Sequence, residues 1–225
     1  MWNKLFLSPF FTPIAFILCW SLEIFSVCSL HPQEILQQTL DGAFIDVVAK
    51  IGYIFLVVLL FFLYRDFENK MLSWGIYIFL TIGCFLRESG IQHCLSKTDT
   101  TPFKSRFFLN PENPMYEKIL FGLVLLLILG VIAYLAVKYA KHLVKSFFKL
   151  DTVTWTIAVL CVTGVVSKII DRYPSNYRKA HGGVSLPEDV YAVFQLVEEL
   201  SEMFLPYLAM LALLQFHFLN KKQAN

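Results

Sequence analysis

The chain has 225 residues, of which 57% are hydrophobic, 16% aromatic and only 16% charged, and its formal net charge is +2. Ordinary soluble domains carry roughly a quarter charged residues, and the 22 Phe side chains are more apolar aromatic surface than a small soluble core buries. The composition therefore excludes an ordinary soluble domain and predicts a polytopic helical membrane protein. The small net charge, without a basic tract, gives no reason to expect a nucleic-acid partner.

A transmembrane helix needs about 20 mostly apolar residues at 1.5 Å each. Six segments meet this requirement, so we predict an all-α, polytopic integral membrane protein with about six transmembrane helices in a single bundle. The predicted spans are residues 5–28, 43–64, 72–94, 118–137, 152–171 and 187–219. With no internal repeat, residues 1–225 are expected to form one transmembrane domain.

The first predicted span resembles a secretory signal peptide because it follows Lys4 and is strongly apolar. No small-x-small cleavage site follows it, so we expect an uncleaved signal anchor. The five cysteines form no C-x-x-C pair, and their odd number indicates no disulfide framework.

The connection between the fourth and fifth spans, residues 138–150, contains four lysines and no acid. A short all-basic loop marks the cytoplasmic side of a membrane. With six spans, the N- and C-termini are then also cytoplasmic, and the loops at 29–40, 95–117 and 172–186 lie outside. We predict a multi-pass cell-membrane protein whose outer side faces the periplasm or an organelle lumen. A bacterial inner membrane fits the small chain without Asn-x-Ser/Thr sequons.

Charged residues recur at one depth in nearly every predicted span. Glu88 is 16 residues from Leu72, or roughly 24 Å at helical rise, which places it near the outer boundary of a core about 30 Å thick. The other members of this layer are Glu23, Asp46, Arg87, Asp171 and Glu199. Ionisable groups inside hydrocarbon are costly and usually face one another, water or a substrate. We therefore expect an outward-opening polar pocket between spans two, three, five and six.

The leading hypothesis is that this pocket binds or modifies an anionic, lipidic substrate. The protein would then be either a binding protein or an enzyme. Arginine suits phosphate and carboxylate groups by its planar fork, and a nearby carboxylate serves as a general base. The residues expected to hold the anion are Arg87, Lys168, Arg172 and Arg106. The residues expected to perform acid–base catalysis are Glu88, Asp171, Glu199 and Glu202.

A divalent metal ion is the candidate cofactor, with Glu88, His93 and Glu199 as candidate ligands. Such a carboxylate-rich set suits Mg²⁺, Mn²⁺ or iron more than zinc. The chain contains neither the Glu-x-x-His spacing of helical di-metal sites nor an H-E-x-x-H motif.

The alternative hypothesis is a non-catalytic membrane subunit, sensor or transporter whose charged layer is a structural or ion-coupling network. Carboxylates paired with lysine in membrane interiors commonly couple protons or ions. Six helices with little soluble mass also suit a subunit that packs against a membrane-protein partner or forms a homo-oligomer. Membrane lipids are the partners expected under either hypothesis.

Overall fold

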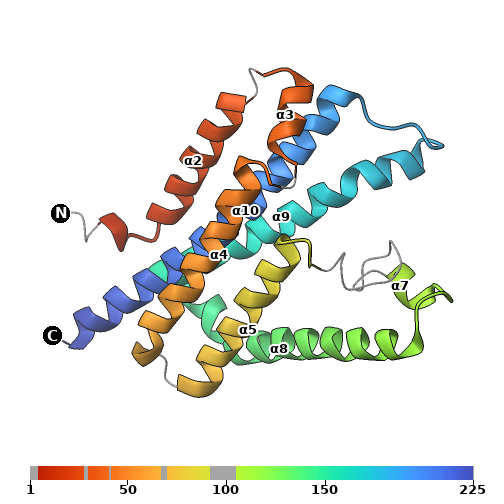
Figure 1. The fold of residues 1–225 in the computed structure, drawn as a ribbon. Coiled ribbons are helices and arrows are strands. Elements are labelled where there is room, and N and C mark those ends of the chain that lie inside the picture. Colours follow the sequence, from red (N-terminus) through yellow and green to blue (C-terminus); the bar gives the residue numbers. More distant parts are fainter. Residues whose placement is uncertain (1–4, 28–29, 41, 67–69, 92–104, 225) are drawn as a thin grey trace.

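The computed structural model describes residues 5–27, 30–40, 42–66, 70–91 and 105–224, and within these ranges every regular element is a helix (Figure 1). Five helices are long and apolar enough to cross a membrane. They are α4 (Phe44–Phe62), α5 (Lys70–Glu88), α8 (Met115–Phe148), α9 (Thr152–Ala180) and α10 (Glu188–Ala224). The predicted all-helical, membrane-embedded architecture is confirmed.

The first predicted span is shorter than expected. Helix α2 (Phe11–Val27) has 17 apolar-rich residues, or roughly 25 Å at helical rise, which is less than a bilayer core of about 30 Å. Residues 5–10 form a short turn before it, with the Ser8 amide bonded to the Leu5 carbonyl at 3.0 Å. The described residues therefore form five long candidate spans and one shorter apolar helix, α2.

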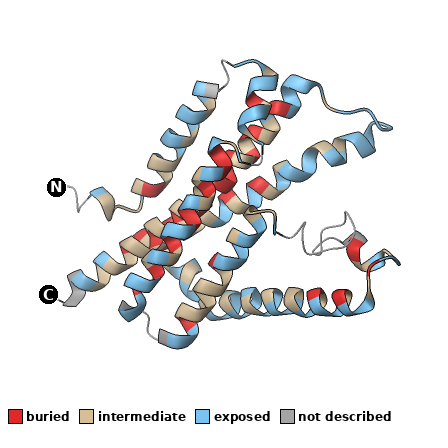
Figure 2. Ribbon diagram, viewed as in Figure 1, coloured by how far each residue is buried: buried red, intermediate tan, exposed pale blue. Residues whose placement is uncertain are grey.

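Helix α10 is the centre of the fold because it packs along α9, α4 and the short helix α3 (Pro32–Gln38). Figure 2 shows the buried residues concentrated on α4 and α10. The main core cluster consists of Ile35, Ile45, Ala49, Ala192, Leu196, Leu200 and Met203. These side chains come from α3, α4 and α10, so the buried core lies where the three helices meet.

Helices α4 and α10 approach each other closely at Gly52. A Cβ atom at this position would lie 2.8 Å from Cγ of Pro206 and 2.9 Å from Cε2 of Tyr207. The Tyr207 hydroxyl donates to the Val48 carbonyl at 2.9 Å, which fixes the register of the two helices. Since no other residue lacks a Cβ, Gly52 is required for this contact.

A second core cluster joins α4 to α5. It contains Tyr53, Leu56 and Leu60 of α4, against which Trp74 and Ile78 of α5 pack. The Trp74 indole nitrogen also donates to the Leu60 carbonyl at 3.1 Å. The 3-10 helix η1 (Tyr64–Asp66) follows α4, and together these contacts hold α4 and α5 as neighbours.

A buried hydrogen-bond network anchors α2 to α9 and α10. The Thr156 hydroxyl is 2.6 Å from the Gln215 amide oxygen and 2.6 Å from the Thr12 hydroxyl. The Gln215 amide nitrogen donates to the Phe6 carbonyl at 3.2 Å. Because Thr12, Thr156 and Gln215 are all at most 1% exposed, each polar group needs the others as partners.

Helix α8 has little contact with the rest of the chain. Its most apolar window has a mean hydropathy of 2.9, yet only 6% of that window is buried, and Figure 2 shows its apolar stretch largely exposed. Its contact with other helices is mainly with α9. Short helix α7 (Ser105–Leu109) precedes α8 and contributes Phe107 to a small cluster with Phe121.

The predicted loop at 138–150 is wrong for most of its length, because α8 continues to Phe148. That segment contains neither Gly nor Pro, and lysine is a good helix former. The true connection is only Lys149–Asp151, where Leu150 has φ 58° and the Asp151 carboxylate accepts the Thr154 amide at 2.9 Å. Helix α9 likewise runs to Ala180, past Pro174, into the predicted loop at 172–186.

Candidate functional site

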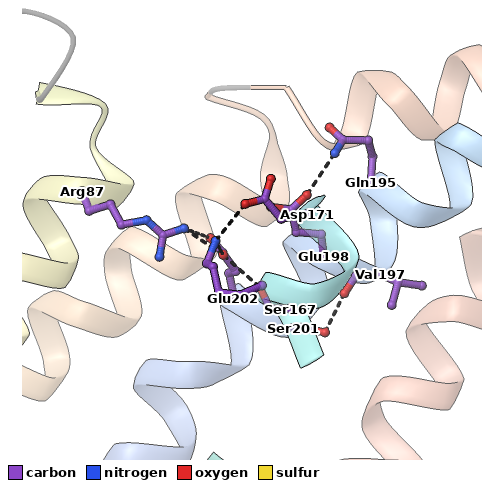
Figure 3. A network of polar contacts seen from close by, with 9 residues as sticks. Arg87, Ser167, Asp171, Gln195, Val197, Glu198, Ser201 and Glu202 are labelled. Carbon is purple, nitrogen blue, oxygen red and sulfur yellow. Dashed lines mark hydrogen bonds and ion pairs between the residues drawn. The ribbon is translucent and has the colours of Figure 1, made fainter. Parts of the chain in front are cut away.

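Glu202 of α10 is the centre of a charged network that joins three helices (Figure 3). Arg87 of α5 donates from Nη2 to both Glu202 oxygens, at 2.8 and 2.7 Å. Lys168 of α9 lies 2.5 Å from Oε1 of Glu202, and the Ser167 hydroxyl donates to the same oxygen at 2.9 Å. The Glu202 side chain is 7% exposed. Its negative charge is therefore balanced by the neighbouring cations Arg87 and Lys168 rather than by solvent.

Local sequence explains why these groups meet. Ser167 is fully buried and faces α10. The side chain of the adjacent Lys168 extends to the Glu202 carboxylate. Lys168 also lies 3.7 Å from Asp171, three residues further along α9. Pro206 stands four residues after Glu202 and donates no amide proton, which leaves the Glu202 carbonyl without its helical partner. The network is thus held at an irregular point of α10.

The other acids of the predicted layer fall into two groups. Asp46, at the start of α4, is occupied by the Lys50 ammonium at 2.7 Å and the Gly42 amide at 2.6 Å. Glu198, which is 8% exposed, accepts from the Gln195 amide at 3.0 Å. Glu88 and Glu199 form no hydrogen bond or ion pair with the residues that the structure describes, although both are within electrostatic range of Glu202.

The structure therefore brings together most of the predicted catalytic residues. Glu88 of α5 and Glu199 of α10 are within electrostatic range of Glu202, and Lys168 links Glu202 to Asp171. Their accessibility differs, because three side chains already make four contacts with the Glu202 carboxylate. Glu88 and Glu199 have no such contacts with the residues that the structure describes. Glu23 of α2 is exposed.

The predicted anion-binding residues are placed in three different settings. Arg87 and Lys168 are paired with Glu202. Arg172 is exposed on α9 and forms no ion pair or hydrogen bond with the described part of the chain. Arg106 belongs to helix α7, but its side chain is not part of what the structure describes.

The predicted metal site gains no support. Among the described residues, no group of three or more His, Cys, Asp or Glu side chains is arranged to hold a metal ion. Glu88 and Glu199 lie within electrostatic range of each other, but the third candidate ligand, His93, lies outside the described residues.

A shallow, open depression, here called the α9 groove, runs along one face of α9 and is lined by that helix alone. Its wall is formed by Leu160, Cys161, Gly164, Val165, Lys168, Ile169, Arg172 and Asn176. The part from Leu160 to Val165 is uncharged. Lys168, Arg172 and Asn176 lie nearer the C-terminal end of α9, with Ile169 between the two cations. The polar end begins at Lys168, roughly 24 Å from Thr152 at helical rise. It lies at the depth of the Glu202 network, because Lys168 belongs to both.

Sequence reasoning missed two features of this site. Ser167 was not among the predicted site residues, although its spacing of four from Asp171 places both on one side of α9. The apolar residues of the groove were missed because a lipid-facing residue and a groove-lining residue are both simply hydrophobic in a sequence. The chain matches no protein-family model, no curated protein and no solved structure.

Proposed function

We propose that the protein is an integral membrane protein that binds an anionic amphiphile, a lipid or a molecule like one, in the α9 groove. Lys168 and Arg172 bind the anionic head group, and the apolar stretch from Leu160 to Val165 contacts the hydrocarbon chain. The observation that carries this proposal is the groove itself, whose wall is apolar along most of its length and cationic near one end.

The charges of the groove support an anion rather than a cation as ligand. Arg172 has no counter-ion among the described residues, and arginine binds phosphate or carboxylate through two parallel hydrogen bonds. Lys168 keeps its ammonium between Glu202 and Asp171. Its side chain is still 43% exposed, so it is accessible from the groove as well as from the network.

The length of α9 supports a ligand at a membrane boundary. The apolar residues of the groove lie in the candidate span, and Arg172 follows them. An amphiphile lying parallel to α9 would therefore place its head group at the depth of Arg172 and its hydrocarbon in the bilayer core. We propose, from the lysines near the end of α8, that this boundary is the outer one and that the termini are cytoplasmic.

A second candidate function is a non-catalytic subunit whose charged layer holds helices together. One observation favours it: Glu202 is already saturated by three neighbouring side chains, Arg87, Lys168 and Ser167. A saturated carboxylate has little capacity left for acid–base work. Under this candidate, the groove holds only lipids that exchange freely with the bilayer.

Native mass spectrometry of the full chain in a neutral detergent tests the proposal. The protein is equilibrated with equal amounts of phosphatidylglycerol and phosphatidylcholine, and the retained lipids are counted. We expect one phosphatidylglycerol to be retained preferentially. Arg172→Gln should weaken its retention about tenfold, since hydrogen bonds to charged groups contribute about 1.5 kcal/mol or more.

Two further variants sharpen this test. Gly164→Leu should reduce retention by filling the groove, and it should fold, because a Cβ there would meet only Leu205 at 3.8 Å. Arg178→Gln is the matched control, since Arg178 is equally exposed on α9 but does not line the groove. Equal retention of the two lipids, or equal loss in Arg172→Gln and Arg178→Gln, would leave the subunit as the better account.

A further inference from the structure

The last three turns of α8 carry a second charged surface that lies apart from the groove. The stretch from 119 to 137 contains no charged residue and is about 28 Å long at helical rise, so it is long enough to cross a bilayer core. Lys138 follows it directly, and the helix then continues to Phe148. The lysines beyond 137 are therefore placed at a head-group boundary by length alone.

Four lysines in this segment share one side of the helix. At about 100° per residue, Lys138, Lys141 and Lys145 fall within an arc of about 60°, and Lys149 at the C-cap continues the same side. We call these four residues the lysine stripe. All four are exposed, and none forms an ion pair with the residues that the structure describes.

The acid that follows the stripe in the sequence, Asp151, forms no ion pair with it. Asp151 uses the same carboxylate oxygen to accept the amide and the hydroxyl of Thr154, at 2.9 and 2.7 Å. The helix dipole accounts for cations in the last turn only, so it explains Lys145 and Lys149 but not Lys138 or Lys141. Lys138 lies over the rings of Tyr134 and Tyr139, at 5.5 and 5.1 Å from their centroids. The stripe therefore presents positive charge that no acid of the described residues pairs with.

Apolar side chains flank the stripe on the exposed surface. Val137, Val144 and Phe148 are 84%, 60% and 80% exposed, and by helical spacing they form a row beside the lysines. The other side of this segment is turned toward α9, where the Phe147 ring stacks on Trp155 with centroids 4.7 Å apart. Adjacent apolar and lysine rows are the arrangement of a helix at a bilayer interface, with hydrocarbon under one row and head groups against the other.

We propose that the lysine stripe binds the head groups of anionic phospholipids at the membrane boundary where α8 ends. Val137 lies at the edge of the hydrocarbon core, the rest of the apolar row lies in the interfacial layer, and the ammonium groups bind lipid phosphates. This surface lies at the opposite end of the bundle from the α9 groove, because only Lys149–Asp151 separates α8 from the beginning of α9, whereas Lys168 is 16 residues further on. It therefore faces the other leaflet and does not depend on the function proposed for the groove.

Trp155 provides a local reporter for the test, since its indole nitrogen donates to the Phe147 carbonyl at 3.1 Å. The full chain, with its other tryptophans replaced by Phe, is reconstituted into bilayers of phosphatidylcholine. Fluorescence quenching is then measured with dibrominated phosphatidylglycerol and, separately, with dibrominated phosphatidylcholine. We expect stronger quenching by phosphatidylglycerol at low salt and a smaller difference at high salt.

The matched variants change charge at the stripe alone. Each lysine near a membrane surface contributes about 1 kcal/mol, or about fivefold in affinity, so the fourfold Lys→Gln variant should lose the preference for phosphatidylglycerol. The fourfold Lys→Arg variant should keep it, and so should Arg172→Gln, which changes the groove only. Equal quenching by the two lipids in the unmodified stripe would overturn the proposal, as would a preference that survives in the Lys→Gln variant. If that variant fails to fold, the salt dependence of the unmodified stripe decides.

Discussion

The charge network makes a sharp prediction for Glu202→Gln. This substitution keeps the size of the side chain but leaves Arg87 and Lys168, both positively charged, without their shared counter-ion. Breaking a buried ion pair costs about 3 to 5 kcal/mol. The Arg87 and Lys168 side chains are 46% and 43% exposed, whereas Glu202 is 7% exposed. Because the cations keep part of their solvation, we expect a loss near the lower end of that range, about 3 kcal/mol.

Reversible SDS-induced unfolding in mixed micelles, followed by circular dichroism, measures this loss of stability. Glu188→Gln is the matched control, because Glu188 belongs to the first turn of α10 and is exposed; its effect should be below about 0.5 kcal/mol. The triple variant Arg87→Met, Lys168→Met, Glu202→Met removes all three charges together. It should regain most of the lost stability, since apolar replacements of whole buried networks are often neutral or stabilising.

Two results would refute this reasoning. A Glu202→Gln variant as stable as Glu188→Gln would mean that the network contributes nothing to the packing of α5, α9 and α10. A triple variant less stable than Glu202→Gln would mean that the cations are held by something other than this carboxylate.

Three further predictions concern stability and are measured by the same unfolding titration. Gly52→Ala should cost about 1 to 3 kcal/mol by overpacking, because the added Cβ would lie 2.8 Å from Pro206. Gln215→Leu should cost about 1 to 3 kcal/mol, since it leaves the buried Thr156 hydroxyl with one partner fewer. Asp151→Ala removes the N-cap of α9 and should cost about 1 kcal/mol. If any one of these substitutions leaves the free energy of unfolding unchanged, the contact it removes does not stabilise the fold.

The sequence predicted the helical membrane architecture because long apolar runs have few other stable structures in a bilayer. It also predicted a polar pocket to which Arg87, Lys168 and Glu202 contribute, since charges at matching depth on apolar helices need partners. The lengths of α8 and α9 were not predicted. The ends of both helices carry many charges. A charged helical end and a charged loop have similar compositions, so composition does not show where the helix stops.

The centre of the site required the three-dimensional structure for a different reason. Pairing between helices depends on their rotation and neighbours, which helical periodicity within one segment does not determine. The spacing of Asp171 and Lys168 was visible in the sequence, but the choice of Glu202 rather than Glu199 as the second acidic partner of Lys168 was not. The groove on α9 was hidden for the same reason, because it depends on which apolar residues the neighbouring helices leave uncovered.

The most direct test of the central claim, an anionic amphiphile in the α9 groove, is protection of the Cys161 thiol. Cys161 is exposed and lines the groove, so a variant that keeps it as the only cysteine reports occupancy through its rate of alkylation in detergent. At a concentration about four times Kd, phosphatidylglycerol should slow alkylation about fivefold, and phosphatidylcholine should not. A variant with Cys19 of α2 as its only cysteine should be unaffected by either lipid. Equal rates with both lipids at Cys161 would contradict the claim.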